Sequence, residues 1–236
     1  MGDREAFALI QRNLNCRRLL GVFRLLCFVA LGVSALQADV TIGSLIKQVQ
    51  DRYNGAQTLS VHFEERYSIQ GHPRPAETGD LVLKKQGKMR WNYTQPQGKL
   101  FISDGKEVYL YTAEDNRVEK VPLKDTEDMR APLAFLLGRL DMRKEFRDFR
   151  TQPGTGGTWL GASAKSDRLP YETVEMLVAA EGEIRELKVR GRDDSLLSFV
   201  FDNEKVNPQL SDGLFHFTVP AGAEVVDAIE TAAQGR

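Results

Sequence analysis

The residue types that carry most enzyme chemistry are present in this chain of 236 residues, but their spacing forms no recognisable reaction centre. The histidines, His62, His72 and His216, lie in separate segments without the paired spacing of metal ligands. The glycine-rich segment Pro153–Gly157 lacks the Lys-Ser/Thr that completes a phosphate-binding loop. Acidic residues are dispersed among basic ones, which is typical of a solvated surface and not of a catalytic carboxylate pair. We therefore expect no enzyme, no metal site and no cofactor.

The net charge of the chain also limits the classes of partner that it can bind. A formal net charge of -1 argues against a nucleic-acid partner, because phosphate binding needs a basic excess concentrated on one face. Arginines concentrate only before the apolar run Leu25–Leu36, which ends in small residues near Ala35 and Ala38. This order is typical of a secretory signal peptide. We expect residues 1–38 to be that signal and residues 39–236 to be one exported domain; an uncleaved membrane anchor is the alternative.

The chain does supply large apolar side chains with a spacing that gathers them on one face of a β-sheet. Met89, Trp91 and Tyr93 alternate with polar residues, and a period of two places the three on the same face. The same alternation recurs in two preceding segments, at Val61 and Phe63, and at Leu81 and Leu83. A wide sheet face with only two short helices to cover it predicts a partly open hydrophobic cavity.

Two helices are predicted beside these strands. The first spans Leu45–Tyr53, with apolar residues at helical spacing, a cap at Thr41 or Ser44, and Asn54-Gly55 as its end. The second, Pro132–Leu137, is apolar nearly all round and must be covered by a core or by a ligand. From the residues alone, both readings of this second helix stay open.

The remaining segments are read as strands joined by short turns without intervening helices, which favours an antiparallel meander over parallel crossover units. The Asp104-Gly105 pair marks one tight hairpin, and the alternation of Phe215, Phe217 and Val219 predicts a last strand that closes the sheet. We therefore expect a mainly β fold, with one single antiparallel, strongly curved sheet that is covered by a few short helices.

One run of motifs resembles a known family. Lys85, Met89-Arg90-Trp91, Pro96, Ser103–Lys106 and Val108–Tyr111 follow one another as in the core signature of the periplasmic outer-membrane lipoprotein carriers (LolA), and the resemblance extends from about residue 44 to 227. It implies an open half-barrel with a helical lid over a hydrophobic cavity. It also implies a monomeric periplasmic chaperone that takes lipoproteins by their acyl chains from an ATP-driven inner-membrane release complex to an outer-membrane receptor.

The resemblance also implies roles for particular residues. Lys85 takes the place of an arginine that locks the lid through backbone carbonyls, and a lysine keeps the charge but loses the planar five-donor fork. The lid residues are Leu133, Phe135 and Leu136. The acyl-chain cavity is expected to be lined by Tyr53, Val61, Phe63, Leu81, Leu83, Met89, Trp91 and Tyr93.

Two other functions remain open at this stage. The same cavity would suit a carrier of another lipid or glycolipid. A non-catalytic lipoprotein-sensing module would share the fold and would bind a signalling protein.

Overall fold

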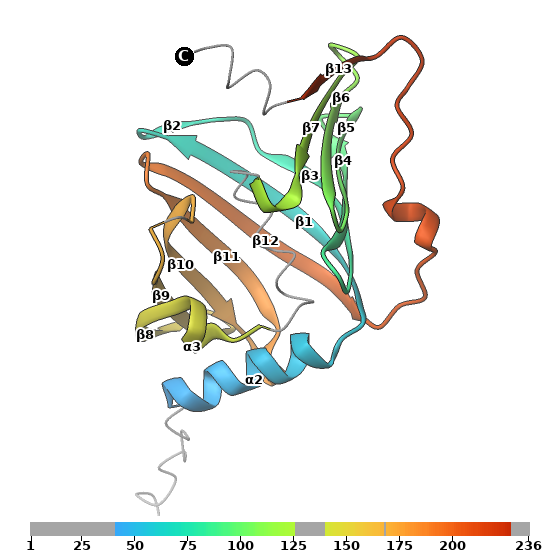
Figure 1. Ribbon diagram of the computed structural model, residues 1–236. Helices are drawn as coiled ribbons and strands as arrows, with labels where there is room; N and C mark the ends of the chain where they lie inside the picture. Colours follow the sequence, from blue (N-terminus) through green and yellow to red (C-terminus); the bar gives the residue numbers. More distant parts are fainter. Residues whose placement is uncertain (1–40, 126–139, 168, 228–236) are drawn as a thin grey trace, which may run out of the picture. The chain divides into compact units, whose positions relative to one another are not determined.

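One curled β-sheet dominates the computed structural model, which describes residues 41–125, 140–167 and 169–227 (Figure 1). The sheet has 13 strands in the order β13-β7-β6-β5-β4-β3-β1-β12-β11-β10-β9-β8, and β2 pairs with β1 alone. Its strands are β1 (Thr58–Ile69), β2 (His72–Pro73), β3 (Glu77–Lys84), β4 (Lys88–Gln95), β5 (Lys99–Asp104), β6 (Glu107–Thr112), β7 (Arg117–Pro122), β8 (Phe146–Gly154), β9 (Gly157–Ala164), β10 (Tyr171–Val178), β11 (Ile184–Gly191), β12 (Ser195–Val206) and β13 (Glu224–Asp227). The predicted mainly β fold with few helices is confirmed.

The helices of the described residues are short or lie at the edge of the sheet. Helix α2 begins where Thr41 Oγ1 accepts a hydrogen bond from the backbone N–H of Ser44 at 3.2 Å, and it buries the predicted apolar stripe that includes Val49 and Tyr53. In Figure 1 it lies across one end of the sheet. The described helices are α2 (Ile42–Gly55), α3 (Met142–Glu145), and the 3₁₀ helices Leu123–Asp125, Ala180–Gly182 and Asp212–Phe215.

The hairpin between β5 and β6 follows from its turn residues. Asp104 Oδ1 accepts hydrogen bonds from the backbone N–H groups of Lys106 and Glu107, each at 2.8 Å. Gly105 has a φ of +96°, a conformation that residues with a Cβ rarely adopt. Partial burial alone would raise the pKa of Asp104, but the donated N–H groups and the nearby Lys106 outweigh it and lower that pKa. The predicted Asp-Gly turn is therefore confirmed.

The sheet is mixed, so the prediction of a purely antiparallel sheet is wrong. Strand β13 runs parallel to β7, with Val225 opposite Val118. The chain between β12 and β13 crosses from the middle of the sheet to the edge beside β7. This connection spans residues 207–223, which is long enough for the chain to enter the edge of the sheet in either direction. A strand of four residues carries no sequence pattern that fixes its direction.

The predicted closing strand at Phe215, Phe217 and Val219 is also wrong. Phe215 lies in a 3₁₀ helix, and residues 216–220 have no strand partner. The ring of Phe217 stacks on that of Tyr109 with 5.1 Å between centroids, and Tyr109 belongs to β6. The segment that carries these aromatic residues therefore packs against strands β4, β5 and β6 instead of extending the sheet. Figure 1 shows its ribbon beside these strands.

The hairpin of β8 and β9 has a tight turn. Helix α3 ends at Glu145 and β8 runs from Phe146 to Gly154, so Pro153 and Gly154 of the glycine-rich segment belong to the strand. Gly154 lies opposite Gly157, so the turn contains only residues 155 and 156. Pro153 fits this strand because β8 is at the edge of the sheet, where a missing N–H leaves no partner unsatisfied.

Candidate functional site, an apolar sheet face

The predicted cavity residues of strands β1, β3 and β4 lie together on one face of the curled sheet, and Tyr53 of α2 belongs to the same hydrophobic cluster. We call the face that carries Phe63, Trp91 and Phe199 the inner face, and the opposite face the outer face. All the predicted residues are at most 4% exposed and belong to one hydrophobic cluster: Tyr53, Val61, Phe63, Leu81, Leu83, Met89, Trp91 and Tyr93. The period-two reading of these strands is thus confirmed, while the binding role of the residues stays a prediction.

Aromatic rings form the centre of the inner face. Phe63 contacts Trp91 edge to face at 4.8 Å between centroids, and Tyr93 in the same way at 5.2 Å. The centroids of the Trp91 and Phe199 rings are 5.3 Å apart. Gly79 makes room for this packing, because a Cβ there would lie 2.9 Å from the tip of the Phe63 ring. Large polarizable side chains are thereby concentrated where strands β1, β3, β4 and β12 run side by side.

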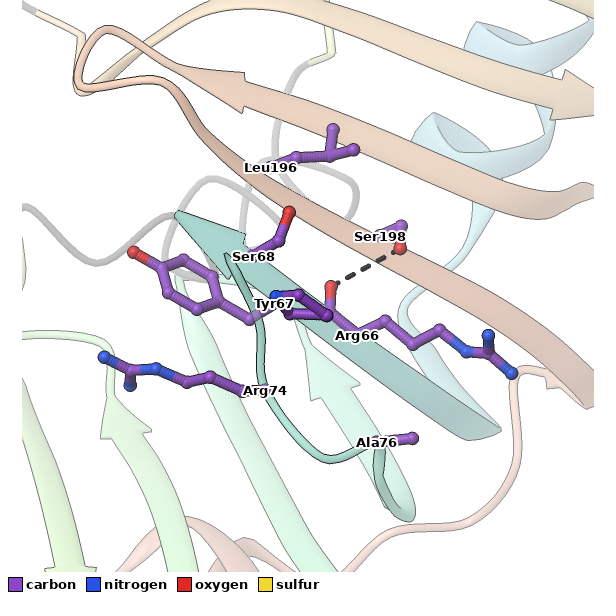
Figure 2. A pocket seen from close by; sticks show the side chains of 8 residues that line it. Arg66, Tyr67, Ser68, Arg74, Ala76, Leu196 and Ser198 are labelled. Carbon is purple, nitrogen blue, oxygen red and sulfur yellow. Dashed lines mark hydrogen bonds between the residues drawn. The ribbon is translucent and has the colours of Figure 1, made fainter. Parts of the chain in front are cut away.

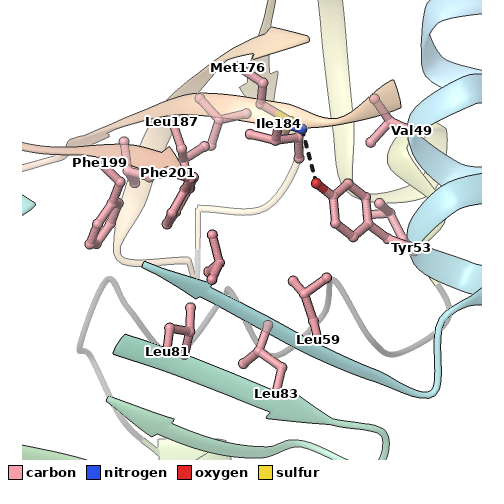
Figure 3. Close-up of a cluster of buried hydrophobic side chains, with 14 of the residues drawn as sticks. Val49, Tyr53, Leu59, Leu81, Leu83, Met176, Ile184, Leu187, Phe199 and Phe201 are labelled. Carbon is pink, nitrogen blue, oxygen red and sulfur yellow. Dashed lines mark hydrogen bonds between the residues drawn. The ribbon is translucent and has the colours of Figure 1, made fainter. Parts of the chain in front are cut away.

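Strands β12, β11, β10, β9 and β8, which we call the second half of the sheet, contribute apolar residues that were not among the predicted site residues. Met176 of β10, Leu187 of β11 and Phe201 of β12 are buried in the same cluster. Figure 3 shows Leu187 and Phe199 on one side and Leu81 and Leu83 on the other, with their side chains directed into the space between. The sequence did contain a pattern for these residues, because Leu197, Phe199 and Phe201 alternate with other residues and therefore share one face of their strand. The inner face therefore extends across both halves of the sheet.

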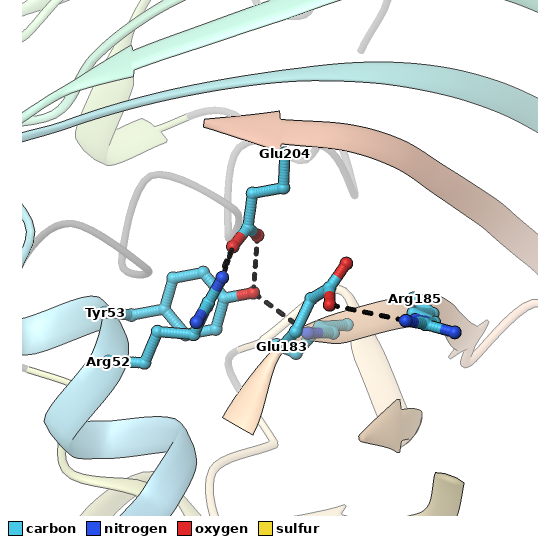
Figure 4. Close-up of polar contacts among 6 residues, drawn as sticks. Arg52, Tyr53, Glu183, Arg185 and Glu204 are labelled. Atoms are coloured by element: carbon cyan, nitrogen blue, oxygen red, sulfur yellow. Dashed lines mark hydrogen bonds and ion pairs between the residues drawn. The ribbon is translucent and has the colours of Figure 1, made fainter. Parts of the chain in front are cut away.

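Tyr53 is fixed at the α2 end of the inner face by its hydroxyl group (Figure 4). The hydroxyl donates to Glu204 Oε2 at 2.8 Å and accepts from the backbone N–H of Ile184 at 3.0 Å. Arg52 donates to Glu204 Oε1 from Nε at 2.8 Å and from Nη2 at 2.6 Å. Burial and the nearby Glu204 charge raise the pKa of Tyr53, which keeps the hydroxyl a donor. This arrangement fastens α2 to β11 and β12.

Lys85 contacts the end of α2. Its Nζ donates to the backbone carbonyl of Asn54 at 3.0 Å, in the last turn of the helix, where an unsatisfied carbonyl and the helix dipole both favour a cation. The Asn54 side chain in turn donates to the carbonyl of Leu140 at 2.9 Å and accepts from its N–H at 2.7 Å. The predicted lid residues Leu133, Phe135 and Leu136 lie outside the described residues, so the predicted contact of Lys85 with a lid stays a prediction.

We expect Lys85→Met to lower the free energy of unfolding by about 1.5 to 3 kcal/mol, because it removes a charged donor from the end of α2. Urea unfolding followed by circular dichroism measures this change. Lys85→Arg is the matched control and should retain most of the stability, since a guanidinium can donate to the same carbonyl. A Lys85→Met variant that unfolds at the urea concentration of the parent protein would contradict this role.

A pocket of about 220 Å³ lies away from the predicted cavity residues, beside the tip of β1 (Figure 2). Its two arginines point in different directions in Figure 2, so their charges do not converge on one ligand. Arg66 is paired with Glu64 at 2.7 Å, and the guanidinium of Arg74 lies 5.0 Å from the centre of the Tyr67 ring. The pocket is lined by Arg66, Tyr67, Ser68, Pro73, Arg74, Ala76, Leu196 and Ser198.

The histidines lie apart from one another. His62 Nδ1 is 3.1 Å from Asp80 Oδ1 on the outer face, His72 is exposed in β2, and His216 follows a 3₁₀ helix instead of lying in the predicted strand. Within residues 41–125, 140–167 and 169–227, no three His, Cys, Asp or Glu side chains come together as metal ligands. In the same part of the chain, no helix has both the length and the apolar character needed to cross a membrane.

Comparison with known proteins identifies similar chains. The model of the family described as outer membrane lipoprotein carrier protein LolA matches residues 54–218. The outer-membrane lipoprotein carrier protein of Nitrosomonas europaea is 28% identical over 205 residues, which cover 86% of this chain and 98% of that protein. The protein of the same name from Cupriavidus pinatubonensis is 27% identical over 202 residues, covering 84% and 94%. A crystal structure of a LolA superfamily protein from Nitrosomonas europaea covers 75% of this chain and 98% of its own, with a TM-score of 0.42 and 9% identity.

Proposed function

The chain belongs to the LolA family of outer-membrane lipoprotein carrier proteins, and from this membership we propose that it is a periplasmic chaperone for lipoproteins. The inner face binds the acyl chains of the lipoprotein. The observation that carries this proposal is the inner face itself, where apolar side chains from both halves of one curled sheet form a continuous cluster. An acyl chain offers no hydrogen-bonding groups along its length, so a broad apolar surface is the chemistry that it requires.

The energy of acyl burial supports a carrier that receives and hands over its cargo. Burial of an acyl chain is worth about 0.8 kcal/mol per CH₂ group. For a lipoprotein with three long acyl chains, release of these chains from the protein into water would therefore cost on the order of 30 kcal/mol. This cost is above the ceiling of roughly 20 kcal/mol for non-covalent affinity. We propose that an ATP-driven inner-membrane complex loads the protein, and that an outer-membrane receptor with its own apolar surface takes the cargo from it.

The leader is part of the same proposal. Residues 1–38 lie outside the described residues, and we propose that they form a signal peptide that is removed on export to give a monomeric periplasmic protein of residues 39–236. N-terminal sequencing of the exported protein should find a start near Ala35 to Asp39. A start before Leu25 would show that the leader is retained.

The function is tested by copurification with a lipoprotein that is expressed in two forms, one acylated and one with its acylated cysteine changed to serine. We expect the acylated form to copurify from periplasm at about one copy per protein molecule, because the inner face recognises the chains and not the polypeptide. The serine form should be absent from the purified complex. Equal recovery of both forms, or recovery of neither, would refute acyl-dependent carriage.

A further inference from the structure

A buried hydrogen-bond donor stands out on the inner face. Trp91 is 0% exposed, and among the described residues its indole Nε1–H has no hydrogen-bond partner. Buried donors are nearly always satisfied, and an unsatisfied one destabilises the folded protein. The neighbouring ring contacts, with Phe63 and Phe199, are made by apolar groups that cannot accept a strong hydrogen bond. An acceptor brought by a ligand would satisfy this donor.

The polarity of the inner face changes along β4. Met89 lies opposite Leu83, which in turn lies opposite Leu59, just after α2, so these paired positions of β1, β3 and β4 are apolar. Towards the other end of the strand, Tyr93 follows Trp91 on the same face.

Polar groups surround Tyr93. Its hydroxyl donates to Glu65 at 2.7 Å, and Glu65 is only 6% exposed. The ammonium of Lys99 lies 4.4 Å from the centre of the Tyr93 ring and is also bonded to Glu77. A ligand with an apolar tail and a polar root matches this order, with its tail towards α2 and its root near Tyr93.

We propose that Trp91 Nε1–H donates a hydrogen bond to an ester carbonyl oxygen at the root of a bound, glyceryl-linked acyl chain, and that the chain runs from there towards α2. This assignment rests on the proposed function. It adds a polar recognition point to an otherwise non-directional apolar surface, because an acyl chain by itself fixes neither its depth nor its direction. The ester carbonyl is the acceptor nearest to the chain and enters the apolar region with it.

The test compares two N-acetylated peptides whose cysteine carries either a dipalmitoylglyceryl group or the matching dihexadecylglyceryl ether, which lacks the carbonyl oxygens. We expect the parent protein to bind the ester about tenfold more tightly than the ether, and Trp91→Phe to bind both equally. Equal binding of both peptides by the parent would overturn the assignment and leave the carrier function standing. Binding of neither peptide would overturn both. If Trp91→Phe still binds the ester more tightly than the ether, a group other than Trp91 donates to the carbonyl, and the assignment is overturned.

A second measurement needs no change at Trp91. The protein has two tryptophans, so in the Trp159→Phe variant all tryptophan fluorescence comes from Trp91. Ester peptides with bromine atoms beside the carbonyl should quench Trp91 at least twofold more strongly than peptides brominated at the methyl end. The opposite order would contradict the proposed direction of the chain.

Discussion

Replacing Glu204 by alanine is expected to lower the free energy of unfolding by about 3 to 5 kcal/mol, because its carboxylate is the shared acceptor that joins α2 to the second half of the sheet. The Glu204 side chain is 5% exposed and that of Arg52 is 21% exposed. Without the carboxylate, the Arg52 charge and the Tyr53 hydroxyl lose their partner in a largely desolvated place. Guanidinium unfolding of purified variants measures the loss.

A matched control is available one strand away. Glu183 and Arg185 form an ion pair at 3.6 Å with side chains that are 27% and 51% exposed (Figure 4). Because water screens such a pair, Glu183→Ala should lower the free energy of unfolding by less than about 1 kcal/mol. Losses of similar size in Glu204→Ala and Glu183→Ala would mean that the buried contacts do not fasten α2.

The second large effect is expected at the inner face. Trp91→Lys should weaken the binding of acylated lipoprotein by at least about 100-fold, since a charge would be placed where the acyl chains need an apolar surface. Asn92→Lys is the control, because Asn92 is the next residue of the same strand and is exposed on the outer face. Binding is measured by titration with a fluorescent acylated peptide. Equal losses in both folded variants would mean that the inner face is not the acyl site.

Arg90 is a less suitable control than Asn92, although it also lies on the outer face. Its Nη1 donates to the backbone carbonyl of Leu214 at 3.2 Å and helps to hold the chain that covers the outer surface. Burial lowers the pKa of Arg90, which agrees with this partly covered position. A change there would disturb folding as well as binding.

A milder pair of variants keeps the test valid if Trp91→Lys does not fold. Val61 is buried on the inner face, and Val82 lies on the outer face of the neighbouring strand, opposite Ser60. Threonine has nearly the shape of valine, with a hydroxyl group in place of one methyl group. Val61→Thr should weaken acyl binding by about tenfold, and Val82→Thr by less than about twofold.

The inner face of β1, β3 and β4 could be predicted from the sequence because a period of two is a local property. Once Met89, Trp91 and Tyr93 alternate with polar residues, any sheet that contains them must gather them on one side. Helix α2 and the Asp104-Gly105 turn are local in the same sense, since their caps and turn donors come from residues at most three positions away. Local chemistry of this kind is visible in a single sequence.

Features that depend on distant segments were not predictable in this way. Glu204 accepts from Arg52 across 152 positions, and nothing in the sequence around either residue marks the other. The alternation of Phe215 and Phe217 looks like a strand, but it arises here because aromatic side chains pack onto Tyr109. Lys85 was expected to donate to backbone carbonyls of the lid, and that contact stays a prediction. Its hydrogen bond to the carbonyl of Asn54 in α2 joins positions 31 residues apart, and no local pattern in the sequence marks it.

The central claim is that the acyl chains lie on the inner face, and photo-cross-linking tests it most directly. A lipoprotein whose palmitoyl chains carry a diazirine is loaded onto the protein and irradiated, and the labelled peptides are identified by mass spectrometry. We expect labels on inner-face residues of both halves of the sheet, such as Met89, Leu187 and Phe199. Labels confined to the outer face, or to the pocket beside Arg66 and Arg74, would contradict the account.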